Sequence, residues 1–183
     1  RSGQRPRRAD RTSDPRDPGA LPAGLEAIEQ LGDRTDLVVR MGEQRIVART
    51  GKPITLVGWS LGGYIARELA RDLPDAIAGV VTLGSPAVGG PKYTITAAAY
   101  RKKGFDLDAI EAEMAKRNAI PIRCPLTVLF SKVDGIVSWP ATLDRLTPQA
   151  RHVEVRSSHI GLVHDTEVFR TIANVLADQR SKP

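Results

Sequence analysis

The stretch at residues 55–66, TLVGWSLGGYIA, joins a short apolar run to an amphipathic segment through a serine flanked by glycines. The run at 54–58 predicts a buried strand, and after Ser60 the spacing is that of a helix with one apolar face: Leu61, Ile65, Leu69 and Leu73. Gly58 and Gly62 predict a tight turn, because neither adds a side chain that would hold strand and helix apart. A strand that leads straight into a helix is the repeating unit of a parallel sheet, and this unit constrains the fold more than any other feature.

Three further apolar runs predict strands near 79–83, 126–130 and 152–156. The segment DTEVFRTIANVLADQ predicts a closing helix with one aligned apolar face: Val168, Ile172 and Val175. Apolar strands that alternate with helices predict an α/β fold, with a mostly parallel sheet flanked by helices on both faces.

The expected organisation is a basic tail at 1–20 followed by one domain at 21–183. The tail lacks apolar periodicity and is expected to be disordered. The spacing predicts two further helices, at 21–31 and 36–50. A helical insertion at about 87–124 contains FDLDAIEAEMAKR, which either packs on the domain or roofs a pocket through its apolar residues: Ile95, Leu107, Ile110 and Met114.

Composition narrows the class of protein. The net charge is +6, but half of it lies in residues 1–18, so we interpret the charge as a solvated arm rather than a nucleic-acid surface. One cysteine, Cys124, excludes an internal disulfide. No apolar run approaches 18 residues, which predicts a cytoplasmic protein without stable membrane insertion, although the chain starts at Arg1 and an upstream portion can precede it. Neither metal-ligand spacing nor a glycine-rich phosphate loop is present, and no cofactor is expected.

Ser60 is the candidate nucleophile. A serine hydroxyl reacts when it is held exposed beside a base, with backbone N–H groups aimed at the developing oxyanion. A sharp turn from strand to helix provides this arrangement, and the N–H of Leu61 then points to where an oxyanion would form. The G-x-S-x-G motif alone is a weak signal, and its setting between a strand and a helix strengthens it.

The base and the acid are expected beyond the carboxyl ends of other strands, where reactive groups collect in a parallel sheet. Asp134 follows the third predicted strand and His159 follows the fourth. Taken singly, Asp134 with Gly135 is an ordinary turn dipeptide and His159 is a structural histidine. Taken together with Ser60, in this order, they predict a catalytic triad.

Other candidates remain open. His164 is the second choice for the base, whereas His152 falls at the start of a strand, on the wrong edge of the sheet. Ser85 also follows a strand, but Pro86 and the lack of a following helix favour a place in a pocket floor. Cys124 has no nearby base in the sequence and is interpreted as structural.

Three blocks together resemble the carboxyl half of α/β-hydrolase fold lipases and esterases, especially the bacterial group related to triacylglycerol lipases: LVGWSLGGYIARELARDLPDAIAGVVTLGSP, PLTVLFSKVDGIVSW and HVEVRSSHIGLVHDTEVFRTIANVLA. The resemblance covers about residues 36–178. It implies Ser60 as nucleophile, Asp134 as triad acid, His159 as base and the Leu61 N–H as one oxyanion donor. In that family several strands precede the nucleophile, and a loop among them supplies a second donor. Here only 53 residues do, so the N-terminal strands are expected to be absent.

The sequence therefore predicts a serine hydrolase of carboxylic esters, acting on a small-molecule ester or lipid through an acyl-enzyme. The alternative is a catalytically weak or inactive fragment or subunit that pairs with another chain, as a homo-oligomer or with a missing N-terminal portion. A basic-tailed binding protein is a third hypothesis.

Overall fold

The computed structural model describes residues 51–180. The predicted tail at 1–20 and the predicted helices at 21–31 and 36–50 lie outside the described residues. Among the described residues no helix has both the length and the apolar character needed to cross a membrane.

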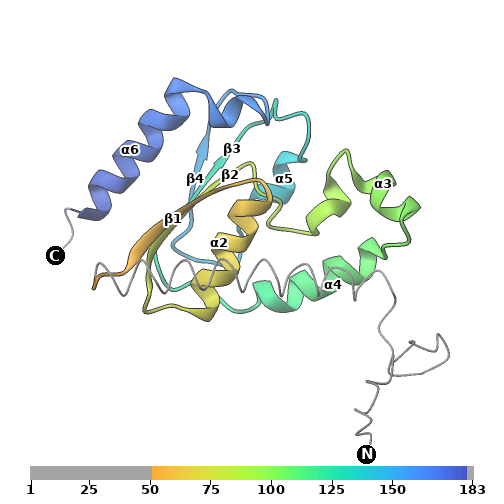
Figure 1. The fold of residues 1–183 in the computed structure, drawn as a ribbon, viewed down its shortest axis with the longest axis horizontal. Helices are drawn as coiled ribbons and strands as arrows, with labels where there is room; N and C mark the ends of the chain where they lie inside the picture. The colour runs from red at the N-terminus through yellow and green to blue at the C-terminus, as the bar shows by residue number, and fades with distance from the viewer. Residues whose placement is uncertain (1–50, 181–183) are drawn as a thin grey trace, which may run out of the picture.

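A four-stranded sheet forms the centre of the described domain (Figure 1). Its strands are β1 (Ile54–Trp59), β2 (Ile77–Leu83), β3 (Leu126–Phe130) and β4 (Arg151–Glu154), and they lie side by side in chain order. All three pairings are parallel. The predicted α/β fold with a parallel sheet is confirmed. Because all four strands run in the same direction, their carboxyl ends lie at the same edge of the sheet.

Helices cover both faces of this sheet, as Figure 1 shows. Helix α2 (Leu61–Asp72) packs Ala66 and Ala70 against one face, together with Val80 and Val128. The last helix, α6 (Thr166–Arg180), packs its three predicted apolar residues against the other face: Val168, Ile172 and Val175. Because successive strand residues point to opposite faces, β1, β2 and β3 contribute to both cores, which explains their apolar runs, whereas β4 adds only Val153 to the core under α6.

Helix α2 buries only part of the apolar face that its spacing predicts. Leu69 is buried, but Leu61 is 59% exposed. The buried face instead includes Arg67, Glu68 and Arg71. The prediction is wrong for Leu61 because the first turn of α2 lies at the carboxyl edge of the sheet, where no described element covers this side chain.

The connection from β2 to β3 contains a short 3-10 turn, η1 (Gly90–Tyr93), and two helices, α3 (Ala97–Lys102) and α4 (Leu107–Asn118). Asp106 is the N-cap of α4, because its carboxylate accepts hydrogen bonds from the N–H groups of Asp108 and Ala109. The apolar side of α4 is buried with Tyr64 of α2, through Leu107, Ile110 and Met114. These three residues pack the helix onto the domain, whereas Ile95 is 69% exposed. After β3 and β4 come two short elements, α5 (Trp139–Thr142) and η2 (Gly161–Val163).

Candidate active site

Ser60 lies at the junction of β1 and α2, in a strained backbone conformation. Its φ is 53° and its ψ is −123°, and it is the one non-glycine residue with positive φ among the described residues. Such a conformation costs of the order of 1–3 kcal/mol and persists where the surrounding structure holds it. The backbone N–H of Ser60 donates to Leu83 O at 2.9 Å, which ties the junction to the end of β2. Ser60, which is half-buried, therefore lies in a fixed turn at the carboxyl edge of the sheet.

The close approach of strand and helix at this turn requires two glycines. A Cβ on Gly58 would collide with the backbone of Gly62 and Gly63, as the sequence predicts for this position. A Cβ on Gly63 would collide with Ser85 Oγ and would lie 2.7 Å from Gly58 O. The prediction for Gly62 is wrong, because a Cβ there would meet no described atom within 4 Å. The second glycine of the turn that packing requires is Gly63, which is buried against Gly58 of β1 and Ser85, two residues after β2.

Asp134 lies in the turn after β3 and is 4% exposed. Its Oδ1 accepts hydrogen bonds from the N–H groups of Ile136 and Val137, at 2.9 and 2.6 Å. Gly135 adopts the left-handed conformation, with φ 79°, which lets the chain turn back over the carboxylate. One carboxylate oxygen is thus held by the backbone, and Oδ2 remains for another partner.

That partner is His159, which follows β4 and is 3% exposed. His159 Nδ1 lies 2.8 Å from Asp134 Oδ2. The backbone N–H of His159 also donates to Asp134 O at 2.8 Å, so main chain and side chain are both fixed to the same residue. Residues 25 positions apart in the sequence thereby form one buried pair.

Two residues that the sequence analysis did not assign to the site border this pair: Trp59 contacts His159, and Gly84 leaves space for the pair. Trp59 Nε1 donates to His159 O at 3.0 Å, and the rings of the two residues lie 5.2 Å apart. Gly84 has φ 54°, and a Cβ there would lie 2.8 Å from Asp134 Oδ2 and 3.1 Å from His159 Nδ1. Trp59 directly precedes Ser60, so it links the histidine to the serine turn. The sequence signal for both was their place at the ends of β1 and β2.

The structure brings Ser60, Asp134 and His159 to the same edge of the sheet, after β1, β3 and β4 respectively. Within the described residues no hydrogen bond joins Ser60 to His159. Hydrogen bonds of this kind are often long or absent before substrate binds. Leu61 is the first residue of α2. The first N–H groups of a helix have no acceptor within the helix, and the N–H of Leu61 is one of them.

The competing candidates lie in other surroundings. Ser85 is 1% exposed and packs against Gly63. It was expected in a pocket floor, but it is not among the residues that line the cavity described below. His152 lies in β4, and its Nε2 accepts the N–H of Asp144 at 3.1 Å. His164 is exposed at the end of η2. Cys124 is buried in the apolar core, and burial raises the pKa of its thiol.

Over residues 51–180 no group of three His, Cys, Asp or Glu side chains is placed to hold a metal ion. A cavity of about 390 Å³ lies beside α2, but Ser60, Asp134 and His159 are not among the residues that line it.

Comparison with known proteins gives one family and several solved structures. Residues 39–121 match a family model described as the α/β-hydrolase fold, a range that includes Ser60. No curated protein matches the chain.

The solved structures cover more of the chain. An α/β-superfamily hydrolase from Oenococcus oeni PSU-1 is 13% identical with a TM-score of 0.61, over 82% of this chain and 74% of that one. A putative lipase from Acinetobacter baumannii AYE is 19% identical with a TM-score of 0.60, over 82% and 69%. A monoacylglycerol lipase from Paleococcus ferrophilus is 17% identical with a TM-score of 0.57, over 81% and 76%.

At these identities a structural match establishes the fold, and the family model agrees with it. The resemblance to α/β hydrolases is confirmed, and the chain has the α/β-hydrolase fold.

Proposed function

We propose that the chain is a serine hydrolase that cleaves carboxylic esters, with Ser60 as nucleophile, His159 as base and Asp134 as the acid that orients it. The contact of 2.8 Å between His159 Nδ1 and Asp134 Oδ2, at the edge that also carries Ser60, is the observation that supports this function most strongly. An imidazole whose Nδ1–H donates to a carboxylate presents its Nε2 lone pair to a serine hydroxyl. Fold alone does not select a reaction, so the proposal rests on these side chains.

In the proposed reaction Nε2 of His159 removes the proton from Ser60 Oγ as this oxygen attacks the ester carbonyl carbon. The tetrahedral intermediate collapses as His159 returns the proton to the departing alkoxide, which leaves as an alcohol. Water then attacks the acyl-enzyme with the same base, and the carboxylic acid is released. Asp134 stabilises the imidazolium that forms in both steps, and its own Oδ1 stays bound to backbone N–H groups.

The N–H of Leu61 is proposed as one oxyanion donor. The positive φ of Ser60 sets the direction of the first turn of α2, and the helix dipole adds positive charge at that end. Negative charge that develops on the carbonyl oxygen beside Ser60 would therefore be stabilised. One donor of this kind is worth about 100- to 1000-fold in turnover.

Exposed apolar residues next to each of the three side chains favour an apolar substrate. Leu61 follows Ser60 and is 59% exposed, Val133 precedes Asp134 and is 54% exposed, and Ile160 follows His159 and is 54% exposed. Large apolar side chains gathered at a reactive edge mark a surface for apolar ligands. This supports an ester with an acyl or alkyl chain rather than a strongly polar one.

Hydrolysis of a short p-nitrophenyl ester by the whole chain tests the proposal. Ser60→Ala should lower the rate by a factor of about 10⁴ or more, because triad members act as a unit. Ser85→Ala is the matched control, since this serine follows the neighbouring strand and is buried. Circular dichroism must show both variants folded. Activity that survives in Ser60→Ala and disappears in Ser85→Ala would show that the nucleophile is misassigned.

A further inference from the structure

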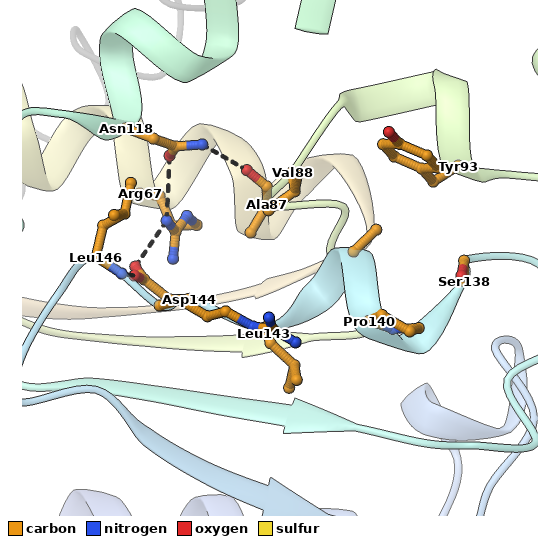
Figure 2. Close-up of a pocket in the computed structure, with 12 residues that line it drawn as sticks. Arg67, Ala87, Val88, Tyr93, Asn118, Ser138, Pro140, Leu143, Asp144 and Leu146 are labelled. Atoms are coloured by element: carbon orange, nitrogen blue, oxygen red, sulfur yellow. Dashed lines mark hydrogen bonds and ion pairs between the residues drawn. The ribbon is translucent and has the colours of Figure 1, made fainter.

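The cavity beside α2 is a second place where a ligand could bind (Figure 2). It has a volume of about 390 Å³, within the range of small-molecule sites. Arg67 reaches it from α2, Asn118 from α4, Tyr93 from η1, and Ser138 and Asp144 from either side of α5. The β2–β3 connection therefore lines this space together with α2, which precedes it, and α5, which follows it. The proposed hydrolase mechanism does not use this space.

The unusual feature of this cavity is the guanidinium of Arg67, which is 2% exposed. Its Nη2 lies 2.8 Å from Asp144 Oδ2 and donates to Asn118 Oδ1 at 3.4 Å. Its Nε and Nη1 are buried and have no hydrogen-bond partner among the described residues. These two atoms carry three N–H bonds. A buried polar group without a partner is costly, so such groups are rare in folded proteins.

The polar neighbours of Arg67 cannot supply the missing acceptors, because they are already used. Asp144 Oδ1 accepts the N–H groups of Leu146 and Thr147, and its Oδ2 accepts the Thr147 hydroxyl besides Arg67. Asn118 Oδ1 also accepts from Arg71, and its Nδ2 donates to the backbone O of Ala87. Asp144 and Asn118 therefore leave Arg67 Nε and Nη1 unpaired within the described residues, and this supports a role for a molecule in the cavity as the acceptor.

The rest of the lining defines that molecule. Six of the lining residues are apolar: Ala87, Val88, Pro140, Ala141, Leu143 and Leu146. The hydroxyl of Tyr93 donates to Glu111 Oε1 at 2.7 Å, so Tyr93 can offer its ring to the cavity. The charged residues of the lining are the buried pair Arg67 and Asp144 and the solvent-exposed Arg145, so the lining has a formal net charge of +1. A ligand with one singly negative hydrogen-bond acceptor group and an apolar chain matches all of these features.

We propose that this cavity binds a monocarboxylate with an alkyl chain of medium length, its carboxylate on Arg67 and its chain on the apolar lining. At roughly 30 Å³ for each water-sized group, the volume accommodates about a dozen non-hydrogen atoms, the size of octanoate or decanoate. The carboxylate accepts hydrogen bonds from the guanidinium, the group best suited to this anion. The inference goes beyond the proposed ester hydrolysis and does not depend on it.

Isothermal titration of the whole 183-residue chain, carrying Ser60→Ala, tests the proposal without any catalysis. Octanoate at pH 7 should bind saturably with one molecule per chain. Octan-1-ol and octylamine, which have the same chain length but no carboxylate, should bind at least about tenfold more weakly. Equal binding of the three ligands would overturn the proposal, and so would the absence of octanoate binding, which would mean that water alone completes Arg67.

Two further variants locate the ligand. Val88→Trp fills the cavity from its rim and leaves the Arg67–Asp144 pair intact, so octanoate binding should be lost in a folded protein. Arg67→Lys keeps the charge but removes most of the donors, and binding should weaken at least about tenfold. Arg101→Gln, an exposed cation of α3 outside the cavity, is the control and should bind as before. Octanoate binding that is unchanged in Val88→Trp would place the ligand elsewhere and contradict the proposal.

Discussion

The two buried aspartates of the described residues, Asp134 and Asp144, each contact a basic side chain, and the two pairs differ in how completely their polar atoms are satisfied. His159 with Asp134 and Arg67 with Asp144 are both joined at 2.8 Å, and all four residues are at most 5% exposed. In each pair the acid is held by two backbone N–H groups of the residues that follow it. The construction of the acid is therefore the same, and the difference lies in the partner.

The partner at the sheet edge is an imidazole with one remaining nitrogen, whereas the partner beside α2 is a guanidinium with three remaining N–H bonds. The imidazole nitrogen acts as an acceptor or base, and the guanidinium acts only as a donor. In the two proposals, the same kind of buried aspartate supports proton transfer in one region and anion recognition in the other. Each prediction below separates these two roles.

The largest expected effect is at the sheet edge, in catalysis. His159→Ala should lower ester hydrolysis by about 10⁴-fold, since the base cannot be replaced by a neighbour. His164→Ala, which removes an exposed histidine five residues later, should leave the rate within a few-fold of the parent chain. The measurement is the initial rate on a short p-nitrophenyl ester. If only His164→Ala loses activity, the base belongs to His164 and the proposed pair is structural.

The next largest effect is on the stability of the other pair. Arg67→Met leaves Asp144 buried without its cation and should lower the free energy of unfolding by about 3–5 kcal/mol. The double variant Arg67→Met with Asp144→Leu removes both charges and should recover most of this loss. Urea denaturation measures both. Lys132→Met, which breaks the exposed pair with Glu154, is the control and should cost less than about 1 kcal/mol. An Arg67 cost as small as that of Lys132 would mean that the buried pair is not formed.

A smaller effect is expected from the glycines of the serine turn. Gly63→Ala should destabilise the fold by about 3 kcal/mol, because the added methyl group collides with Ser85 and Gly58. Gly62→Ala is the matched control one residue earlier, and it should be neutral or stabilise the fold by up to about 1 kcal/mol. Thermal or urea unfolding gives both values. The reverse order of the two costs would show that Gly62, and not Gly63, faces the neighbouring strand.

The smallest effect depends on pH and belongs to Asp144. Burial raises the pKa of this carboxyl. The charge of Arg67 and the hydrogen bonds from Thr147 and Leu146 outweigh burial, and the net result is a pKa lowered from 3.8 to about 2. Since the folded pKa is the lower one, the ionised form stabilises the fold fully above about pH 4, and this stability is lost as the pH falls towards 2.

The size of this contribution is about 2 kcal/mol, from the shift in pKa. The free energy of unfolding of the parent chain should therefore fall more steeply between pH 4 and pH 2 than that of Asp144→Asn, which cannot titrate at this position. Denaturation in urea at several pH values measures the two slopes. Parallel slopes would show that Asp144 titrates alike in the folded and unfolded chains.

The sequence predicted the sheet well because burial leaves a direct pattern in it. A strand covered on both faces must be apolar throughout, and the run at 126–130 predicts β3 with its observed bounds. The run at 152–156 was less informative, because β4 is mostly exposed and ends at Glu154. The apolar face of α6 and that of α4 were likewise predicted, since both helices bury every third or fourth residue.

The Arg67 cavity could not be predicted, because its residues come from four separate segments and its signal is polar. In ARELARDL the charged residues suggest a solvated helix face, yet Arg67 is among the most deeply buried side chains of the domain. Only the fold brings Asp144 and Asn118 to it. Gly63 was missed for a related reason, since the motif marks Gly62 and the choice between adjacent glycines depends on the direction of the first helical turn.

Labelling with a fluorophosphonate probe, followed by mass spectrometry of the digested chain, tests the central claim most directly. Only a serine activated by a neighbouring base reacts with such a probe. The account predicts one adduct, on Ser60, that disappears in His159→Ala and persists in Arg67→Lys, because the Arg67–Asp144 pair takes no part in activating the serine. An adduct on Ser85 instead, or no adduct on the folded chain, would contradict it.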